Sequence, residues 1–248
     1  GRLAGARVLL ELHDAMSTPL YHSLFTLASP LCDGFIVVSR RTKEIYFSGI
    51  NARQARKPVF EIPVPVDIGR FNPTEVEAAA DLANCDGISV TTVCNINPDK
   101  GLEHFVEMAH LLETRYSSLR FNIVGLEHET QRSYAAGLRR VAKQAGVRNL
   151  QFIGARYNVP AVLKATDIYV CSSVSEASPT SVWEAMAMER AIVSTRVGDV
   201  ARYITDGENG FIVPVADGAA LAEKVGVLIE NEHMRRSFGP KARAAVVP

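Results

Sequence analysis

The sequence lacks the features that would place it in several large protein classes. Its cysteines, Cys32, Cys85, Cys94 and Cys171, show no C-x-x-C spacing, and its six histidines show no metal-ligand spacing. Lys plus Arg equals Asp plus Glu at 27 each, so no net field attracts a nucleic acid. No run of about 18 apolar residues could span a bilayer. We therefore expect reduced cysteines in the core of a soluble, cytoplasmic protein that binds neither a metal nor nucleic acid.

The first residues also lack the pattern of a secretory signal. The chain begins at Gly1, and residues 8–12 (VLLEL) have the character of a strand in the middle of a sheet, so we expect upstream sequence in the same protein. A length of 248 residues is long for one domain of roughly 150 residues and short for two. Apolar residues make up 47%, enough for a core without disulfides. One complete domain with part of another is the expected organisation.

Apolar runs alternate with helical patterns along most of the chain. The expected strands are residues 8–12, 34–39, 88–95, 119–125, 150–154, 168–172, 191–195 and 211–214. The expected helices are residues 19–31, 102–113, 130–145, 159–165, 179–188 and 219–230, with others beginning near 41 and after 232. Apolar strands separated by helices predict an α/β protein with a doubly wound parallel sheet. Such sheets bind ligands, usually nucleotides, beyond the carboxyl ends of their strands.

A proline-rich stretch divides the chain. Residues 57–73 contain four prolines, each of which removes a hydrogen-bond donor, so this stretch is neither an ordinary helix nor a central strand. We predict the end of one α/β domain at residues 1–56, a linker at 57–86 and a complete domain at 87–248.

Two glutamates follow the apolar run at 168–172. Glu176 precedes the predicted helix and Glu184 lies in its second turn, with Ser178 as the expected N-cap and Pro179 at the first helical position. A helix N-terminus attracts an anion, and the Glu184 carboxylate could accept bonds from a ribose diol. Each glutamate alone is more often a solvated surface charge. Their joint place after a buried strand favours a ligand site.

Other signals lie at the same predicted sheet edge. Asp99 could cap the helix near Gly101, placing Lys100 in a first turn where the macrodipole disfavours a cation unless it faces a phosphate. A solvated lysine is the alternative. Glycines also lie at the ends of three predicted strands: Gly125, Gly154 and Gly198. A residue without Cβ permits a turn or the close approach of a ligand.

At these residues the chain resembles the family-4 retaining glycosyltransferases, whose GT-B architecture pairs two Rossmann-like domains. The similarity runs from about His13 to the C-terminus. Its most specific element is SEASPTSVWEAMAMERAIVSTRVG, similar to the family's E-x(7)-E motif followed by E-A-M-A and an apolar strand ending in glycine. The resemblance implies a C-terminal domain that binds a nucleotide-sugar donor and the tail of an acceptor-binding domain before it.

The resemblance also implies site residues. It assigns catalytic roles to His13, Lys100 and Glu176, with Lys100 on the diphosphate, Glu176 on the donor hexose and His13 near the reacting sugar. It assigns Glu184 to the ribose hydroxyls and Arg156 to the nucleobase. The remaining donor-binding positions are Asn95, Gly125, Ser178, Pro179 and Thr180. In the phosphate loop Cys94 replaces the usual glycine and Asn95 the usual arginine, and Arg202 stands where many members carry glutamate.

The implied activity is transfer of a sugar from a nucleoside diphosphate to an acceptor hydroxyl with retained configuration. Neither a metal nor a cofactor is expected. The partners would be a nucleotide-sugar donor and a glycan or lipid-linked acceptor, the latter bringing the protein to the inner face of a membrane. We expect these 248 residues alone not to transfer sugar. The alternatives are a nucleotide-sugar-binding remnant without turnover and a dinucleotide-dependent oxidoreductase, which should carry a G-x-G-x-x-G run that is absent.

Overall fold

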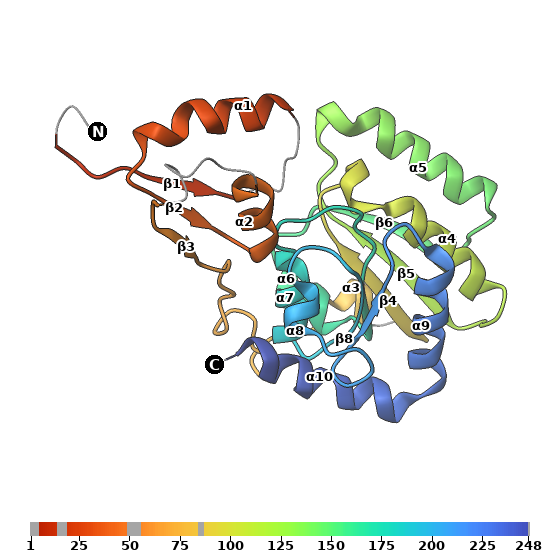
Figure 1. The fold of residues 1–248 in the computed structure, drawn as a ribbon. Coiled ribbons are helices and arrows are strands. Elements are labelled where there is room, and N and C mark those ends of the chain that lie inside the picture. Colours follow the sequence, from red (N-terminus) through yellow and green to blue (C-terminus); the bar gives the residue numbers. More distant parts are fainter. Residues whose placement is uncertain (1–4, 14–18, 49–55, 84–86, 248) are drawn as a thin grey trace.

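The strands form two separate parallel sheets. The structure is a computed structural model and describes residues 5–13, 19–48, 56–83 and 87–247. Within these ranges one sheet has three strands, in the order β1-β2-β3, and the other has six, in the order β6-β5-β4-β7-β8-β9. Figure 1 shows the smaller unit, red to orange, beside the larger one.

The smaller unit is built on a short parallel sheet with an aromatic cluster. Its elements are β1 (Leu9–Leu12), α1 (Pro19–Ala28), the 3-10 turn η2 (Ser29–Leu31), β2 (Gly34–Val37), α2 (Arg40–Phe47) and β3 (Val59–Glu61). Phe25, Phe35 and Tyr46 are buried together. Ser39 caps α2 by accepting a bond from the backbone N–H of Thr42 at 3.1 Å.

The start of the predicted linker belongs to this smaller sheet. Strand β3 pairs with β2 in parallel, with Val59 opposite Phe35. An edge position suits a strand beside Pro58, because proline cannot donate to a central ladder. The boundary that we predicted after residue 56 therefore moves past Glu61. Helix α3 (Ala80–Ala83) lies in the rest of the linker, and the predicted boundary after residue 86 falls next to 84–86, outside the described residues.

The larger unit alternates strands and helices. Its strands are β4 (Ile88–Val93), β5 (Leu119–Val124), β6 (Leu150–Gly154), β7 (Ile168–Cys171), β8 (Ala191–Thr195) and β9 (Phe211–Val213). Its helices are α4 (Leu102–Glu113), α5 (Arg132–Gln144), α6 (Val159–Lys164), α7 (Thr180–Ala187), α8 (Val200–Tyr203), α9 (Gly218–Glu230) and α10 (Glu232–Val246). Short 3-10 turns are η3 (Pro98–Lys100) and η4 (Glu129–Gln131).

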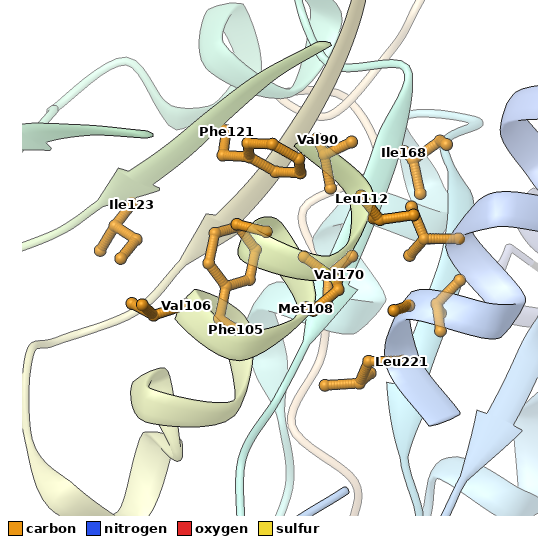
Figure 2. Close-up of a cluster of buried hydrophobic side chains, with 14 of the residues drawn as sticks. Val90, Phe105, Val106, Met108, Leu112, Phe121, Ile123, Ile168, Val170 and Leu221 are labelled. Carbon is orange, nitrogen blue, oxygen red and sulfur yellow. The ribbon is translucent and has the colours of Figure 1, made fainter. Parts of the chain in front are cut away.

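Both faces of the larger sheet are covered, because side chains alternate along each strand. Ile168 and Val170 of β7 pack with residues of α4, α5 and α9, and Figure 2 shows part of this cluster. Tyr169 and Cys171 of the same strand pack on the opposite face with residues of α6 and α7. A fully buried side chain such as Phe121 contributes about 1.5–3 kcal/mol to folding. The sheet is therefore doubly wound, as predicted.

The predicted elements are found with small shifts at their ends. Each predicted strand begins and ends within two residues of an observed one. The helix predicted at 19–31 ends earlier, at Ala28, and continues as the 3-10 turn η2. The short α8 was not predicted, because four residues are too few for a helical period to show.

Candidate functional site

A pocket of about 390 Å³ lies beyond the carboxyl ends of β4, β5 and β6, beside the start of α7. Residues from four loops and from α7 line it: Val93, Cys94, Asn95, Lys100, Gly125, Leu126, Ala155, Arg156, Val159, Glu176, Ser178, Pro179, Thr180, Ser181 and Glu184. Every predicted donor-binding residue is in this set. His13 is not; it follows β1, is exposed, and its Nε2 lies 3.0 Å from the Glu11 carboxylate. The chemical roles of all these residues stay predictions.

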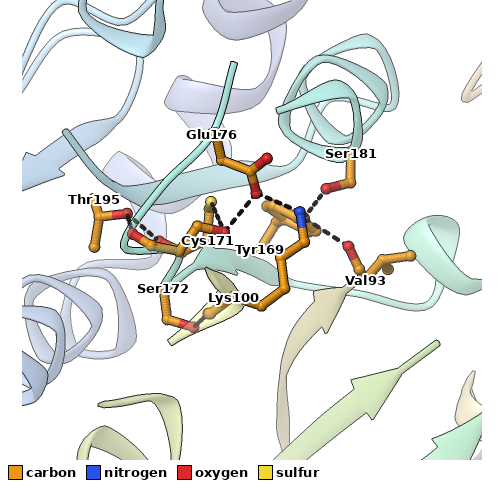
Figure 3. A network of polar contacts seen from close by, with 9 residues as sticks. Val93, Lys100, Tyr169, Cys171, Ser172, Glu176, Ser181 and Thr195 are labelled. Carbon is orange, nitrogen blue, oxygen red and sulfur yellow. Dashed lines mark hydrogen bonds and ion pairs between the residues drawn. The ribbon is translucent and has the colours of Figure 1, made fainter. Parts of the chain in front are cut away.

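The centre of the pocket is an ion pair between Lys100 and Glu176. The Lys100 Nζ lies 2.6 Å from Glu176 Oε1 (Figure 3), and the two side chains are 22% and 13% exposed. The Ser173 hydroxyl donates to the same oxygen at 2.7 Å. Two residues that are 76 positions apart in the chain are thus brought together by the parallel sheet.

Charge and burial have opposite effects on the pKa of Lys100. Burial alone would lower the pKa of the ammonium group, but the Coulomb attraction of Glu176 and the hydrogen bond that Lys100 donates to it raise the pKa more. The pKa of Lys100 is therefore above its usual value, and the side chain is cationic at neutral pH. A phosphate group that binds Lys100 would have to share or replace its contact with Glu176.

Backbone contacts hold the two loops that carry this pair. The Ser172 hydroxyl donates to the Lys100 carbonyl at 2.9 Å, and the Val174 N–H donates to the Asp99 carbonyl at 2.8 Å. Gly101 has φ of 53°, and a Cβ there would overlap the Ser172 carbonyl oxygen. The loops after β4 and β7 therefore form one unit.

These contacts correct our prediction for Lys100. Asp99 does not cap α4; Gly101 occupies the N-cap position without a side-chain bond, and Lys100 ends the 3-10 turn η3 before the helix. The dipole of α4 therefore does not explain the cation. Lys100 is explained instead by its place in the pocket, facing Glu176.

The start of α7 also differs from the prediction. The helix begins at Thr180, the N-cap position is Pro179, and Ser178 makes no cap bond. The Ser178 hydroxyl instead accepts a bond from the Trp183 indole N–H at 3.1 Å. The buried Tyr169 hydroxyl donates to Ser181 Oγ at 2.7 Å, which fixes the first turn. The helix N-terminus still points its positive end into the pocket.

The second glutamate has a different environment. Glu184 is half-buried in the wall of the pocket, and burial raises the pKa of its carboxyl group, while attraction from Arg70 opposes the shift. Hydrogen-bond donors on a ligand, such as ribose hydroxyls, would favour its charged form. Glu184 is suited to accept bonds from a diol.

Two further residues, Arg156 and Gly125, contribute charge and shape to the wall of the pocket. The Arg156 guanidinium pairs with Asp81 at 2.5 Å, at the mouth of the pocket. Gly125 lies so close to Cys94 that a Cβ would overlap the Cys94 carbonyl oxygen, so this strand end requires glycine. Both residues lie where the predicted nucleotide would pass.

The cysteines of the described residues are free thiols. Cys32 and Cys171 are buried, while Cys94 is only half-buried and lines the pocket, so it is not the core residue that we predicted. Burial raises the pKa of the Cys94 thiol to about 12, which keeps it protonated. Cys85 lies outside the described residues.

The described residues lack two other features. They contain no group of three or more His, Cys, Asp or Glu side chains placed to hold a metal ion. No helix in the same ranges combines the length and the apolar character needed to cross a membrane.

Sequence reasoning missed the residues that position the site. Ser173 is 4% exposed and holds Glu176, and the Thr195 hydroxyl donates to the Ser173 carbonyl at 2.6 Å. The only signal for Ser173 was its place three residues before Glu176 in the run SSVSE. Its partner Thr195 ends a different strand, and no spacing in the chain could have connected the two.

Comparison with known proteins identifies a family whose sequence model matches this chain. The sequence model described as "Glycosyl transferases group 1" matches residues 77–245, more than half of the chain. The putative glycosyltransferase EpsD of Bacillus subtilis (strain 168) is 28% identical over 203 residues, covering 82% of this chain and 49% of that protein. The N,N'-diacetylbacillosaminyl-diphospho-undecaprenol alpha-1,3-N-acetylgalactosaminyltransferase of Campylobacter jejuni is 24% identical over 227 residues, covering 89% of this chain and 57% of that protein. The chain thus spans about half the length of these relatives.

Solved structures share the fold. HepE of Anabaena, in complex with UDP and glucose, matches with a TM-score of 0.84 at 18% identity, covering 99% of this chain and 68% of that one. A glycosyltransferase from Rickettsia africae matches with a TM-score of 0.81 at 16% identity, covering 99% and 67%. The predicted fold class is confirmed.

Proposed function

The chain belongs to the glycosyl transferases group 1 family, and from this premise we propose that it carries the nucleotide-sugar site of a retaining glycosyltransferase. One observation carries the proposal. Lys100 from the connection after β4, and Glu176, the N-terminus of α7 and Glu184 from the segment after β7, line one pocket beyond the carboxyl ends of a parallel sheet. This is where doubly wound sheets bind nucleotides. The positive groups suit a diphosphate, and the carboxylates suit the hydroxyls on either side of it.

Each group then has a role in the reaction. Transfer breaks the bond between the sugar C1 and a diphosphate oxygen and forms a bond between C1 and the acceptor oxygen, whose proton passes to the departing diphosphate. The departing diphosphate gains negative charge, which Lys100 and the N-terminus of α7 stabilise. Because the diphosphate is a good leaving group, the two glutamates need not act as the acid and nucleophile of a glycosidase.

The two glutamates bind the donor instead. We assign Glu176 to hexose hydroxyls and Glu184 to the ribose, and place Arg156 near the base and His13 on the acceptor side. In a protein that includes the further segments of its relatives, Glu176→Ala should lower turnover and Glu184→Ala should weaken donor binding. Unchanged kinetics in both variants would defeat these assignments.

The chain is proposed to divide between the two substrates. The six-stranded unit binds the donor, and the three-stranded unit, extended to Glu61, is part of the acceptor side. The name of the Campylobacter relative specifies a diphospho-undecaprenol acceptor, and EpsD is a putative glycosyltransferase. By analogy we propose a glycan or lipid-linked acceptor, in polysaccharide or glycolipid synthesis, and a cytoplasmic protein that meets the membrane through its acceptor. These 248 residues should bind donor without transferring sugar.

A panel of nucleotides tests the proposal. UDP, GDP, ADP and their sugar conjugates, with NAD as a comparison, are added to the purified chain, and thermal unfolding is followed. A ligand at about 100 times its Kd stabilises by about 2.7 kcal/mol, which should raise the Tm by roughly 5–10 °C. We expect this shift from one nucleoside diphosphate and its sugar, and a smaller one in Lys100→Met. A shift with NAD alone, or with none of these ligands, would contradict donor binding.

A further inference from the structure

The pocket supplies its own counter-ion for the group that should bind the diphosphate. The Lys100 ammonium donates to Glu176 Oε1 at 2.6 Å, and both side chains are largely shielded from water. Attraction between such charges is stronger than at an exposed surface, because solvent and salt screen it less. A diphosphate that binds Lys100 must therefore compete with a carboxylate already in contact.

A diphosphate on Lys100 weakens the contact between Lys100 and Glu176. A phosphate oxygen at hydrogen-bond distance from Lys100 would lie within a few ångströms of the Glu176 carboxylate. Like charges at that separation repel strongly in a partly buried site. The other cation that lines the pocket, Arg156, is paired with Asp81. Separating Glu176 from Lys100 relieves this repulsion.

Glu176 has a second partner that can retain it. Ser173 donates to the same carboxylate oxygen at 2.7 Å, so Glu176 stays hydrogen-bonded without Lys100. The serine is fixed in turn, because its carbonyl accepts a bond from the Thr195 hydroxyl at 2.6 Å and both residues are buried. A carboxylate held in this way keeps its second oxygen free to accept bonds from hydroxyl groups.

We propose that the donor diphosphate exchanges with Glu176 as the partner of Lys100, and that Ser173 is a positioning residue that keeps the released carboxylate directed at the donor sugar. The inference rests on the proposed function. It adds that the two halves of the donor bind in a coupled way. The diphosphate frees Glu176, and the hexose hydroxyls then satisfy it, so a donor with its sugar is favoured over the bare nucleotide.

Calorimetry with inorganic pyrophosphate and UDP tests the exchange. In Glu176→Gln, which keeps the shape of the side chain but removes its charge, both ligands should bind about tenfold more tightly than in the wild type, as expected for a lost charged hydrogen bond. In the Lys100→Met background the same substitution should give a clearly smaller gain, because only the repulsion by Glu176 is then removed and not its competition for Lys100. Circular dichroism and the Tm verify that each variant is folded.

Several outcomes would overturn the exchange. The exchange is ruled out if the affinity for pyrophosphate is unchanged or weaker in Glu176→Gln. It is also ruled out if binding is undetectable in both proteins. A gain of the same size in Lys100→Met also rules out the exchange, since repulsion alone would then explain it. If UDP binds neither protein while pyrophosphate binds Glu176→Gln more tightly, the exchange stands and uridine is ruled out as the base of the donor. Failure of the exchange with normal UDP binding leaves the proposed function intact.

The positioning role has its own readout. Ser173→Ala should leave UDP affinity within about twofold, yet lower the preference for UDP-glucose over UDP by about tenfold, the size of one charged hydrogen bond. Ser194→Ala is the matched control, because it removes a buried hydroxyl that donates to the Thr195 carbonyl and contacts Cys171, and makes no recorded hydrogen bond to Glu176. A merely structural role for Ser173 would weaken both ligands equally. Equal weakening, or an unchanged preference, would rule out the positioning role.

Discussion

The pocket beside α7 and the larger cleft between α2 and α8 both gather charged side chains, but they hold them differently. In the pocket, Lys100 and Glu176 are 22% and 13% exposed, and Ser173 adds a buried donor. The cleft has a volume of about 1050 Å³. Its ion pairs, each side chain at least 26% exposed, are Arg40 with Glu44 and Arg202 with Glu61.

We base the proposed binding site on how its charges are held and not on cavity size. Exposed ion pairs are screened and contribute about 0–1 kcal/mol each, whereas partly buried charges with fixed partners interact strongly with a ligand. The loops of the pocket are also joined through the Ser172 and Asp99 contacts. The smaller cavity therefore has the preorganised charges, and the four predictions that follow test this contrast.

The largest effect is expected from Lys100→Met. The substitution keeps most of the volume of the side chain but removes the only charge assigned to the diphosphate. Affinity for the nucleotide identified by the panel should fall by about 100-fold, the upper range for a hydrogen bond to a charged group. Isothermal titration calorimetry measures it. Lys43→Met, which changes a lysine that lines the larger cleft, is the matched control and should not alter affinity; equal losses in both variants would abolish the contrast.

A smaller effect is expected from Glu184→Ala. Loss of a carboxylate that accepts ribose hydroxyls should weaken the nucleoside diphosphate by about tenfold. Pyrophosphate has no ribose, so its affinity should change little. The ratio of the two affinities is the measurement. If both ligands weaken alike, Glu184 does not contact the ribose.

The pH dependence of stability gives a third test. Burial raises the pKa of Glu184 above its usual value of 4.5, so the folded state holds this proton more tightly than the unfolded state. Its contribution to stability is then greatest below pH 4.5 and falls as the pH rises through the raised pKa. Urea unfolding of Glu184→Gln should show less loss of stability over this window than the wild type. Glu208→Gln, at an exposed position, is the control. Equal curves of stability against pH for Glu184→Gln and the wild type would argue against the raised pKa.

The smallest effect is expected in the cleft. Arg202→Ala removes the exposed pair with Glu61 that joins α8 to β3. The free energy of unfolding should fall by less than about 1 kcal/mol, and nucleotide affinity should stay within about twofold. Chemical denaturation and calorimetry measure the two quantities. A large loss of affinity would mean that the cleft takes part in donor binding.

Much of the fold could be predicted because period and composition are local properties. Apolar runs such as 168–172 required burial on both faces, and Tyr169 and Ile168 do lie on opposite faces of the sheet. Errors arose where a tertiary contact overrode a local rule. Ser178 has the chemistry of an N-cap, yet its hydroxyl accepts from Trp183. Residues 59–61, beside prolines, still joined the smaller sheet at its edge.

The candidate site was predictable in its members and not in its connections. Glu176, Glu184 and Lys100 were identifiable because charged residues after buried strands collect at one edge of a parallel sheet. Ser173 was not, since a serine before a glutamate is common and its value depends on a buried oxygen 2.7 Å away.

The amino-acid sequence by itself determined the doubly wound architecture and the charged residues that line the pocket, because the alternation of strands with helices and the apolar period are written along the chain. Only the tertiary structure decided that Glu176 is the partner of Lys100, with Ser173 and Thr195 behind it. The physical reason is that a hydrogen bond depends on distances of a few tenths of an ångström. Such distances are set by the packing of strands that are far apart in sequence.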